Sequence, residues 1–334
     1  MLPAANPMWR PDRTQEASFL ICGERLIFRS NDPRIIQVAH SSFEEDPAGA
    51  DPGERPLEIE LFDKAHVEGG LPFDPLKPTS PVFHNRGYLF SITVDQANHA
   101  VVNMVDGFGF GVVSQDMIVH PEYMRSFFVE AMALSMLGPA RGMLPIHASC
   151  IVIRDRAVLL YGESGTGKST LALTCVQRGA QFLADDVVHL SDRGAGVHAF
   201  GLPYRARLTS ETTARFPGAA AASTPVFLNG SWKQDVDLRR AYPGKARASA
   251  ELAALIFLTP APGGNAELRP LSEEQARHRF RITWPYDLAP PEGAQACLQQ
   301  ALRAGAFELA VSDDPEQAAA LLDGPLDGPG RRRK

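Results

Sequence analysis

The sequence predicts an α/β fold with a smaller β-rich domain at its N-terminal end. An apolar run over 157–161 turns through Gly162-Glu163-Ser164-Gly165-Thr166-Gly167-Lys168-Ser169 into a helix-like run over 170–176. Strand, glycine-rich loop and helix in that order are typical of the phosphate-binding loop (P-loop, Walker A) of nucleotide-binding α/β proteins. Earlier in the chain, short apolar segments separated by Pro, Gly and acidic residues indicate β-strands. A chain of 334 residues suits one large or two modest domains.

The predicted organisation has four parts. We expect a flexible lead-in over 1–17, a β-rich domain over 18–120 that recognises a substrate or partner, a P-loop domain over 121–325, and a disordered basic tail over 326–334.

The N-terminal elements follow from local patterns. Residues 19–28 resemble a hairpin that turns near Gly23, and Asp32 followed by Pro33 predicts a capped helix to about Phe43. Residues 46–56 and 68–81 are rich in Pro, Gly and acids, which favours loops. Strands are expected over 57–62, 87–94, 100–105 and 110–114.

The P-loop half predicts alternating helices and strands. Apolar spacing favours an amphipathic helix over 121–137, a strand over 144–153, and a tight connection at 154–156 to the strand before the loop. A strand over 181–188 follows the loop's helix. Later strands are expected over 197–200, 235–238, 252–258 and 307–311, and later helices over 272–280, 293–304 and 315–322.

Composition excludes several classes. The net charge of −6 gives no general electrostatic basis for binding nucleic acid or an anionic membrane. The four cysteines form no C-x-x-C pair, so neither a zinc site nor a disulfide framework is expected. We see no secretory signal and no apolar run long enough to cross a membrane, which predicts a cytoplasmic protein.

The P-loop predicts a nucleotide-binding site. Backbone N–H groups there can surround phosphate oxygens, Lys168 can place a charge near the β- and γ-phosphates, and the Ser169 hydroxyl can bind Mg²⁺. The expected nucleotide-binding residues are Gly162, Glu163, Ser164, Gly165, Thr166, Gly167, Lys168, Ser169 and Thr170. No guanine-reading Asn-Lys-x-Asp motif is present, so ATP is the expected nucleotide.

A pair of acids, Asp185 and Asp186, ends an apolar strand 17 residues after Lys168. A short helix and a turn fit in that gap, so we expect this strand to lie beside the P-loop strand. Both carboxylates would then reach the edge of the sheet where α/β folds bind ligands. Adjacent strand residues point in opposite directions, which predicts different tasks: one acid for Mg²⁺ and one for an acceptor hydroxyl.

Several runs together resemble the catalytic domain of HPr kinase/phosphorylase and of HPr-kinase-related proteins. They are His147-Ala148-Ser149, the P-loop, Arg178-Gly179-Ala180 and Ala184-Asp185-Asp186. The resemblance covers about residues 140–190, and it implies a P-loop core akin to phosphoenolpyruvate carboxykinase.

That family implies an ATP- and Mg²⁺-dependent kinase acting on a serine of a protein or peptide. By position, Asp185 matches the catalytic base, Ser169 and Asp186 match metal-binding groups, and His147 matches a histidine near the transferred phosphoryl group. The Glu-Ile-Arg-Gly-Leu-Gly signature of the bifunctional enzymes is missing after the acid pair, which weakens the expectation of a reverse reaction and of HPr as substrate. Related proteins phosphorylate ribosomally made precursor peptides of the lasso type, and related enzymes form homo-oligomers.

Two other functions stay open at this point. One is a small-molecule kinase of the carboxykinase-like type, and the other is a nucleotide-gated binding module without transfer. Three further cations, Arg205, Arg207 and Lys233, could meet the phosphoryl group or the acceptor, although a surface role is the simpler interpretation.

Overall fold

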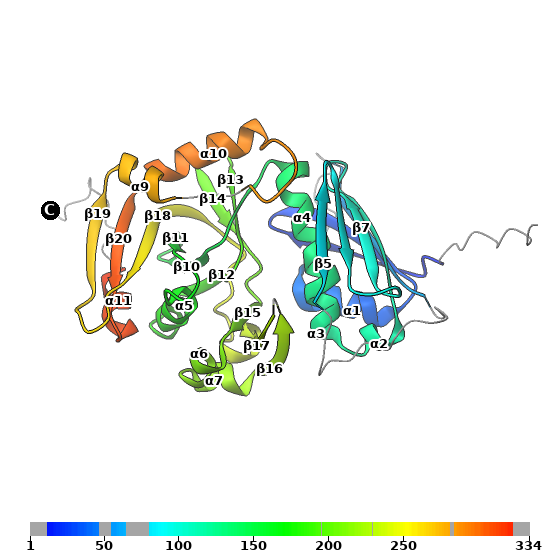
Figure 1. Cartoon of the computed structure of the whole chain (residues 1–334), viewed down its shortest axis with the longest axis horizontal. Coiled ribbons are helices and arrows are strands. Elements are labelled where there is room, and N and C mark those ends of the chain that lie inside the picture. The colour runs from blue at the N-terminus through cyan, green and yellow to red at the C-terminus, as the bar shows by residue number, and fades with distance from the viewer. Residues whose placement is uncertain are drawn as a thin grey trace, which may run out of the picture. The chain divides into compact units, whose positions relative to one another are not determined.

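The computed structural model describes residues 12–46, 55–64, 80–194, 196–228, 230–280 and 284–322. The fold is mixed α/β and divides into two compact units, Met1–Met136 and Leu137–Lys334 (Figure 1). The division falls inside a helix, 16 residues beyond the boundary expected after residue 120. Most of the two predicted N-terminal loops and the basic tail lie outside the described residues.

The first unit is built on an eight-stranded sheet in the order β3-β1-β2-β4-β8-β7-β6-β5. Its strands are β1 (Gln15–Ile21), β2 (Glu24–Ser30), β3 (Glu44–Glu45), β4 (Leu57–Asp63), β5 (Val82–Arg86), β6 (Leu89–Thr93), β7 (His99–Asn103) and β8 (Phe108–Val113). Its helical segments are α1 (Pro33–Ser42), α2 (Gln115–Ile118), α3 (Pro121–Met124) and the π-helical η1 (Arg125–Val129), and α4 (Glu130–Arg141) is the helix in which the division falls.

Local chemistry explains where α1 begins. The Asp32 carboxylate accepts a hydrogen bond from the main-chain N–H of Arg34 at 2.8 Å, and Pro33 occupies the first helical position. The observed elements confirm the predicted hairpin, the capped helix and the four predicted strands of this unit.

Among the described residues, none of the helices has the length and apolar content needed to span a membrane.

The second unit contains a nine-stranded sheet in the order β12-β10-β11-β18-β14-β13-β9, with β20 beside β18 and β19 beside β20. The strands are β9 (Leu144–Ile146), β10 (Ser149–Ile153), β11 (Arg156–Tyr161), β12 (Gln181–Ala184), β13 (Val188–Asp192), β14 (Val197–Phe200), β18 (Ser249–Pro260), β19 (Glu267–Leu271) and β20 (Ala306–Val311). The helices are α5 (Lys168–Gln177), α9 (Glu273–Arg279), α10 (Glu292–Arg303) and α11 (Pro315–Leu321).

Helices cover both faces of this sheet. Along β11, Val158 and Leu160 pack in one cluster with α5 and α11, whereas Ala157 and Leu159 pack in another with α9 and α10. This alternation follows from the two-residue period of a strand. Figure 1 shows α10 above the strands and α5 below them.

One predicted neighbour relation is wrong. The strand after the loop's helix, β12, does not lie beside β11 but pairs with β10. The reason is the hairpin between β10 and β11, whose turn residues Arg154 and Asp155 are both left-handed (φ 50° and 58°). Because that hairpin occupies one side of β11 and β18 occupies the other, β12 must join one strand further out.

A three-stranded antiparallel sheet is inserted between β14 and β18. Its strand order is β15-β17-β16, and only a strand at 235–238 is expected there from the sequence. The elements of the insertion are β15 (Arg205–Leu208), α6 (Ser210–Ala214), α7 (Pro217–Ala221), β16 (Ser223–Leu228), β17 (Ser231–Asp237) and α8 (Leu238–Ala241).

Candidate functional site

The P-loop joins the end of β11 to the start of α5. Gly165 and Gly167 both have left-handed backbones, with φ values of 85° and 90°. A Cβ atom built at either position would meet no heavy atom within 4 Å, so the loop backbone faces open space. Gly167 caps α5, whose first N–H groups are therefore available to an anion at the loop.

Lys168 lies under this loop. Its Nζ donates to the main-chain oxygens of Gly162 at 2.8 Å and Glu163 at 2.9 Å. The residue is only 8 % exposed, and burial lowers the pKa of its amine. The amine is held by carbonyls and forms no ion pair shorter than 4 Å with a carboxylate of the described residues, so its charge remains available to a phosphate.

Asp185 receives hydrogen bonds from two hydroxyl groups. Ser149 Oγ donates to its Oδ1 at 2.5 Å, and Ser169 Oγ donates to the same atom at 2.9 Å. Burial raises the pKa of this carboxyl, while the bond from Ser149 opposes that shift. The contact joins the P-loop serine directly to the first acid of the pair.

Asp186 takes part in a different set of contacts. Nδ1 of His147 lies 2.8 Å from its main-chain oxygen and 3.1 Å from Oδ1, and an Arg207 nitrogen lies 4.0 Å from Oδ2. Because both atoms facing Nδ1 are acceptors, Nδ1 carries the proton. The bond from His147 lowers the pKa of Asp186, and the same bond raises the pKa of His147.

The backbone separates the two acids. The strand β12 ends at Ala184, and Asp186 has a left-handed φ of 77°, which turns the chain out of the strand direction. The two carboxylates thus have separate partners, as expected, but the cause is this turn rather than strand alternation. The sequence analysis assigns the metal ion to Ser169 and Asp186 together. In the structure, however, the Ser169 hydroxyl donates a hydrogen bond to Asp185.

Ser149 is a site residue that the sequence analysis missed. It begins β10, and its neighbour Cys150 pairs with Ala184 at the end of β12, which brings the serine beside Asp185. The His147-Ala148-Ser149 run contains the signal for this residue, because it belongs to the resemblance to HPr kinase/phosphorylase and places Ser149 two residues after His147. Arg207 is also brought to the acid pair, whereas Arg205 contacts Asp235 and Asp237 instead.

The residues at the loop fit Mg²⁺ held together with phosphate. Among the described residues, no group of three or more His, Cys, Asp or Glu side chains could hold a metal ion. Mg²⁺ commonly takes one or two protein oxygens and completes its shell with phosphate and water. Ser169 Oγ and Asp185 Oδ1, 2.9 Å apart beside the P-loop, offer such a donor set.

A close backbone contact supports the acid pair. Gly201 follows β14, and a Cβ atom there would lie 2.4 Å from Cβ of Ala184 and 2.8 Å from the oxygen of Leu183. Only glycine permits this approach. The position of β12 immediately before the acids therefore depends on the absence of a side chain at residue 201.

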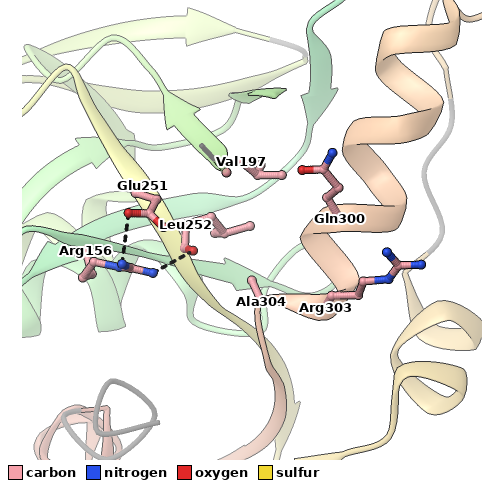
Figure 2. A pocket seen from close by; sticks show the side chains of 8 residues that line it. Arg156, Val197, Glu251, Leu252, Gln300, Arg303 and Ala304 are labelled. Carbon is pink, nitrogen blue, oxygen red and sulfur yellow. Dashed lines mark hydrogen bonds and ion pairs between the residues drawn. The ribbon is translucent and has the colours of Figure 1, made fainter. Parts of the chain in front are cut away.

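A cavity of about 330 Å³ lies at the other end of β11 and β18 (Figure 2). Arg156, the first residue of β11, lines it together with Arg303, and the Arg156 guanidinium donates to a carboxylate oxygen of Glu251 at 3.0 Å. The P-loop follows the last residue of the same strand, Tyr161. The cavity is therefore separate from the loop and the acid pair.

Comparison with known proteins points to one family. The model of the family described as HPr Serine kinase C-terminal domain matches residues 142–201, the segment that holds the loop, both acids, His147 and Ser149. In this segment the chain is HPr-kinase-like. The HPr kinase/phosphorylase of Bordetella pertussis is 44 % identical over 52 residues, which is 16 % of this chain and 17 % of that protein. The HPr kinase/phosphorylase of a Thermoanaerobacter species is 44 % identical over 48 residues, 14 % of this chain and 16 % of that protein.

The chain thus spans about a sixth of the length of the curated relatives that it matches. A solved structure, the Hpr(Ser) kinase/phosphatase from Coxiella burnetii, is 20 % identical with a TM-score of 0.25. That alignment covers 48 % of this chain and 93 % of the other.

Proposed function

We propose that this chain is an ATP- and Mg²⁺-dependent kinase that transfers the γ-phosphoryl group to a serine hydroxyl, with a core of the HPr kinase/phosphoenolpyruvate carboxykinase type. The observation that carries the proposal is the contact between Ser169 and Asp185 beside a complete P-loop. A P-loop serine next to a strand-end carboxylate is the arrangement that phosphoryl transfer uses for its metal ion.

The loop would bind and orient the phosphates. The N–H groups at the start of α5 and the Lys168 amine supply positive charge, and burial strengthens that charge's effect. Mg²⁺, when bound, would offset the charge of the β- and γ-phosphates. The chain's own contribution is therefore positioning and electrostatic stabilisation, which dominate catalysis of this reaction.

The acids would divide metal binding and proton acceptance. In the transfer, the serine oxygen bonds to the γ-phosphorus, the bond to the β–γ bridging oxygen breaks, ADP leaves, and a carboxylate takes the serine proton. The sequence-based roles are Asp185 as base and Asp186 on the metal. The contact with Ser169 favours the reverse, with Asp185 on the metal side and Asp186, 45 % exposed, on the acceptor side beside His147.

The pKa directions favour the first assignment, because burial raises the pKa of Asp185 and makes it the stronger base. We give the contact more weight, because a cation beside Asp185 would itself stabilise the charged carboxylate and lower that pKa.

Two variants test the proposal. With Asp185 on the metal side, Asp185→Asn should need more Mg²⁺ for ATP binding, whereas Asp186→Asn should bind Mg²⁺-ATP normally and lose transfer. Equilibrium binding of labelled ATP at several Mg²⁺ concentrations and single-turnover transfer measure the two effects. The opposite pattern would return the base to Asp185. Normal ATP binding and normal transfer in both variants would refute the roles assigned to the two acids, and no transfer by the wild type to any serine acceptor would refute the kinase proposal.

The acceptor is proposed to be a protein or peptide serine. The curated relatives are named for HPr, and the resemblance to precursor-peptide kinases adds a lasso-type peptide as a second acceptor. We propose that the β-rich N-terminal unit recognises this acceptor. Incubation with labelled ATP and either HPr or a precursor peptide separates the two. Transfer only to metabolites would instead support the small-molecule kinase.

A further inference from the structure

Ser149 lies between the strand of the P-loop and the strand of the acids. It is the first residue of β10, and β10 lies between β12 and β11 in the sheet (Figure 1). On one side, Ser149 pairs with Leu160 of β11, just before the P-loop begins. On the other side, its neighbour Cys150 pairs with Ala184, the last residue of β12. Both neighbouring strands therefore fix the backbone from which the Ser149 side chain projects.

The strand period directs this side chain to the face of the sheet that α5 covers. Ile151, two residues along β10, packs in the same core cluster as Leu171 of α5. Side chains two residues apart on a strand share a face, so Ser149 also lies on that face. Ser169 is the second residue of α5. The two serines therefore approach Asp185 from different elements, one from a strand and one from a helix.

The Asp185 carboxylate has two hydrogen-bond donors in the described part of the chain. Ser149 Oγ and Ser169 Oγ both donate to Oδ1, at 2.5 Å and 2.9 Å, and no hydrogen bond joins another described residue to this carboxylate. The two donors differ in role, because Ser169 is itself a proposed Mg²⁺ ligand. Ser149 is 0 % exposed and is not. It is therefore the donor whose sole partner in the site is the acid.

We infer that Ser149 is a positioning residue for Mg²⁺-ATP, which fixes the Asp185 carboxylate beside Ser169 before nucleotide binds. This inference rests on the proposed kinase function and adds a residue to its metal side. A carboxylate with one donor can rotate about its Cβ–Cγ bond, whereas a second donor restricts that rotation. Groups that orient a metal ligand commonly contribute about 10–100-fold to metal affinity. Loss of the Ser149 hydroxyl should thus raise the Mg²⁺ requirement although no ligand is removed.

The test measures the Mg²⁺ concentration at which labelled ATP binds. Equilibrium binding at fixed ATP and increasing Mg²⁺ is compared for the wild type, Ser149→Ala, Ser149→Cys and Thr174→Val. Cysteine is close to serine in volume but is a weak donor, so Ser149→Cys removes the hydrogen bond without opening a cavity. Thr174→Val is the matched control, because the buried Thr174 hydroxyl donates to the main-chain oxygen of Thr170 rather than to an acid.

Both Ser149 variants should need about tenfold more Mg²⁺ for half-maximal ATP binding, and ATP binding without Mg²⁺ should equal that of the wild type. Thr174→Val should match the wild type at every Mg²⁺ concentration. In an Asp185→Asn background, adding Ser149→Cys should raise the Mg²⁺ requirement no further, because the serine acts through that carboxylate. A serine that only supports the fold would not produce this dependence on Asp185.

Three results would overturn the inference. One is a wild-type Mg²⁺ requirement in Ser149→Cys or in Asp185→Asn. Another is an undiminished further increase when Ser149→Cys is added to Asp185→Asn. The third is loss of ATP binding by both Ser149 variants at every Mg²⁺ concentration, which would assign the serine to the fold alone.

The positioning inference and the kinase proposal fail separately. A Mg²⁺ requirement that depends on Ser149, in a protein that transfers phosphate to no serine acceptor, would remove the kinase function and leave the positioning role. Transfer to a serine acceptor by Ser149→Cys at the wild-type Mg²⁺ requirement would remove the positioning inference alone.

Discussion

Replacing Ser149 by alanine should destabilise the protein in a pH-dependent way. The Ser149 side chain is fully buried and donates to Oδ1 of Asp185 at 2.5 Å. A hydrogen bond to a charged group contributes about 1.5–3 kcal/mol, and one between neutral groups contributes about 0.5–1.5 kcal/mol. The loss should therefore be about 1.5–3 kcal/mol where Asp185 is ionised and about 1 kcal/mol where it is protonated.

The hydrogen bond from Ser149 stabilises the ionised form of Asp185, and this decides how the stability loss in Ser149→Ala changes with pH. The bond from Ser149 favours the carboxylate and lowers the pKa of Asp185, although burial keeps that pKa above its ordinary value of 3.8. The extra contribution of this bond is fully present above the folded pKa and is lost as the pH falls through it. The difference between wild type and Ser149→Ala should consequently be larger above the folded pKa of Asp185, which burial raises, than at acidic pH below it.

Urea unfolding followed by circular dichroism at several pH values measures this difference. Thr174→Val is the matched control, because the Thr174 hydroxyl is buried in the same unit but donates at 2.9 Å to a neutral acceptor, the main-chain oxygen of Thr170. The loss in unfolding free energy caused by Thr174→Val should not vary with pH. A loss for Ser149→Ala that is as constant with pH as the control would refute the reasoning about Asp185.

Three other predictions follow from single contacts. Gly201→Ala should destabilise the protein by about 1–3 kcal/mol and reduce transfer, because the added Cβ would overlap Ala184. Chemical denaturation measures the first effect and a kinase assay measures the second. A variant with unchanged stability and transfer would contradict the packing argument. Lys168→Ala should weaken ATP binding and phosphoryl transfer together. Labelled-ATP binding measures the first effect and single-turnover transfer measures the second. The His147–Asp186 pair is exposed, so its stabilisation should stay below about 1 kcal/mol. Because the histidine pKa is raised, that stabilisation is present below about pH 6.5 and is lost as the pH rises through the folded pKa; an NMR titration of His147 that is unchanged in Asp186→Asn would contradict the pairing.

The strand predictions succeed where one face of a strand is buried. The four predicted strands of the first unit have at least one buried side chain each, and apolar residues mark them in the sequence. In β5, by contrast, all five side chains are exposed, so no alternating pattern exists to reveal it. Its place in the sheet depends on pairing with β6.

The predicted strand over 144–153 shows a second limit. Its composition is continuous, but the structure divides it at His147 and Ala148, since β9 pairs with β13 while β10 pairs with β11 and β12. Different partners require different directions, and this choice lies outside the local sequence. The break also leaves His147 free to reach Asp186.

The P-loop could be predicted from the sequence alone because all of its groups are contiguous and its glycines have a local conformational reason. The same holds for the β11–loop–α5 order and for the capped helix α1. The contact of Ser149 with Asp185 joins residues 36 apart, and that of Ser169 with Asp185 joins residues 16 apart. Those contacts depend on β12 pairing with β10 and on the left-handed turn at Asp186, so tertiary structure alone determined which acid lies on the P-loop serine. Side chains distant in sequence meet only through strand register, which local propensity does not encode.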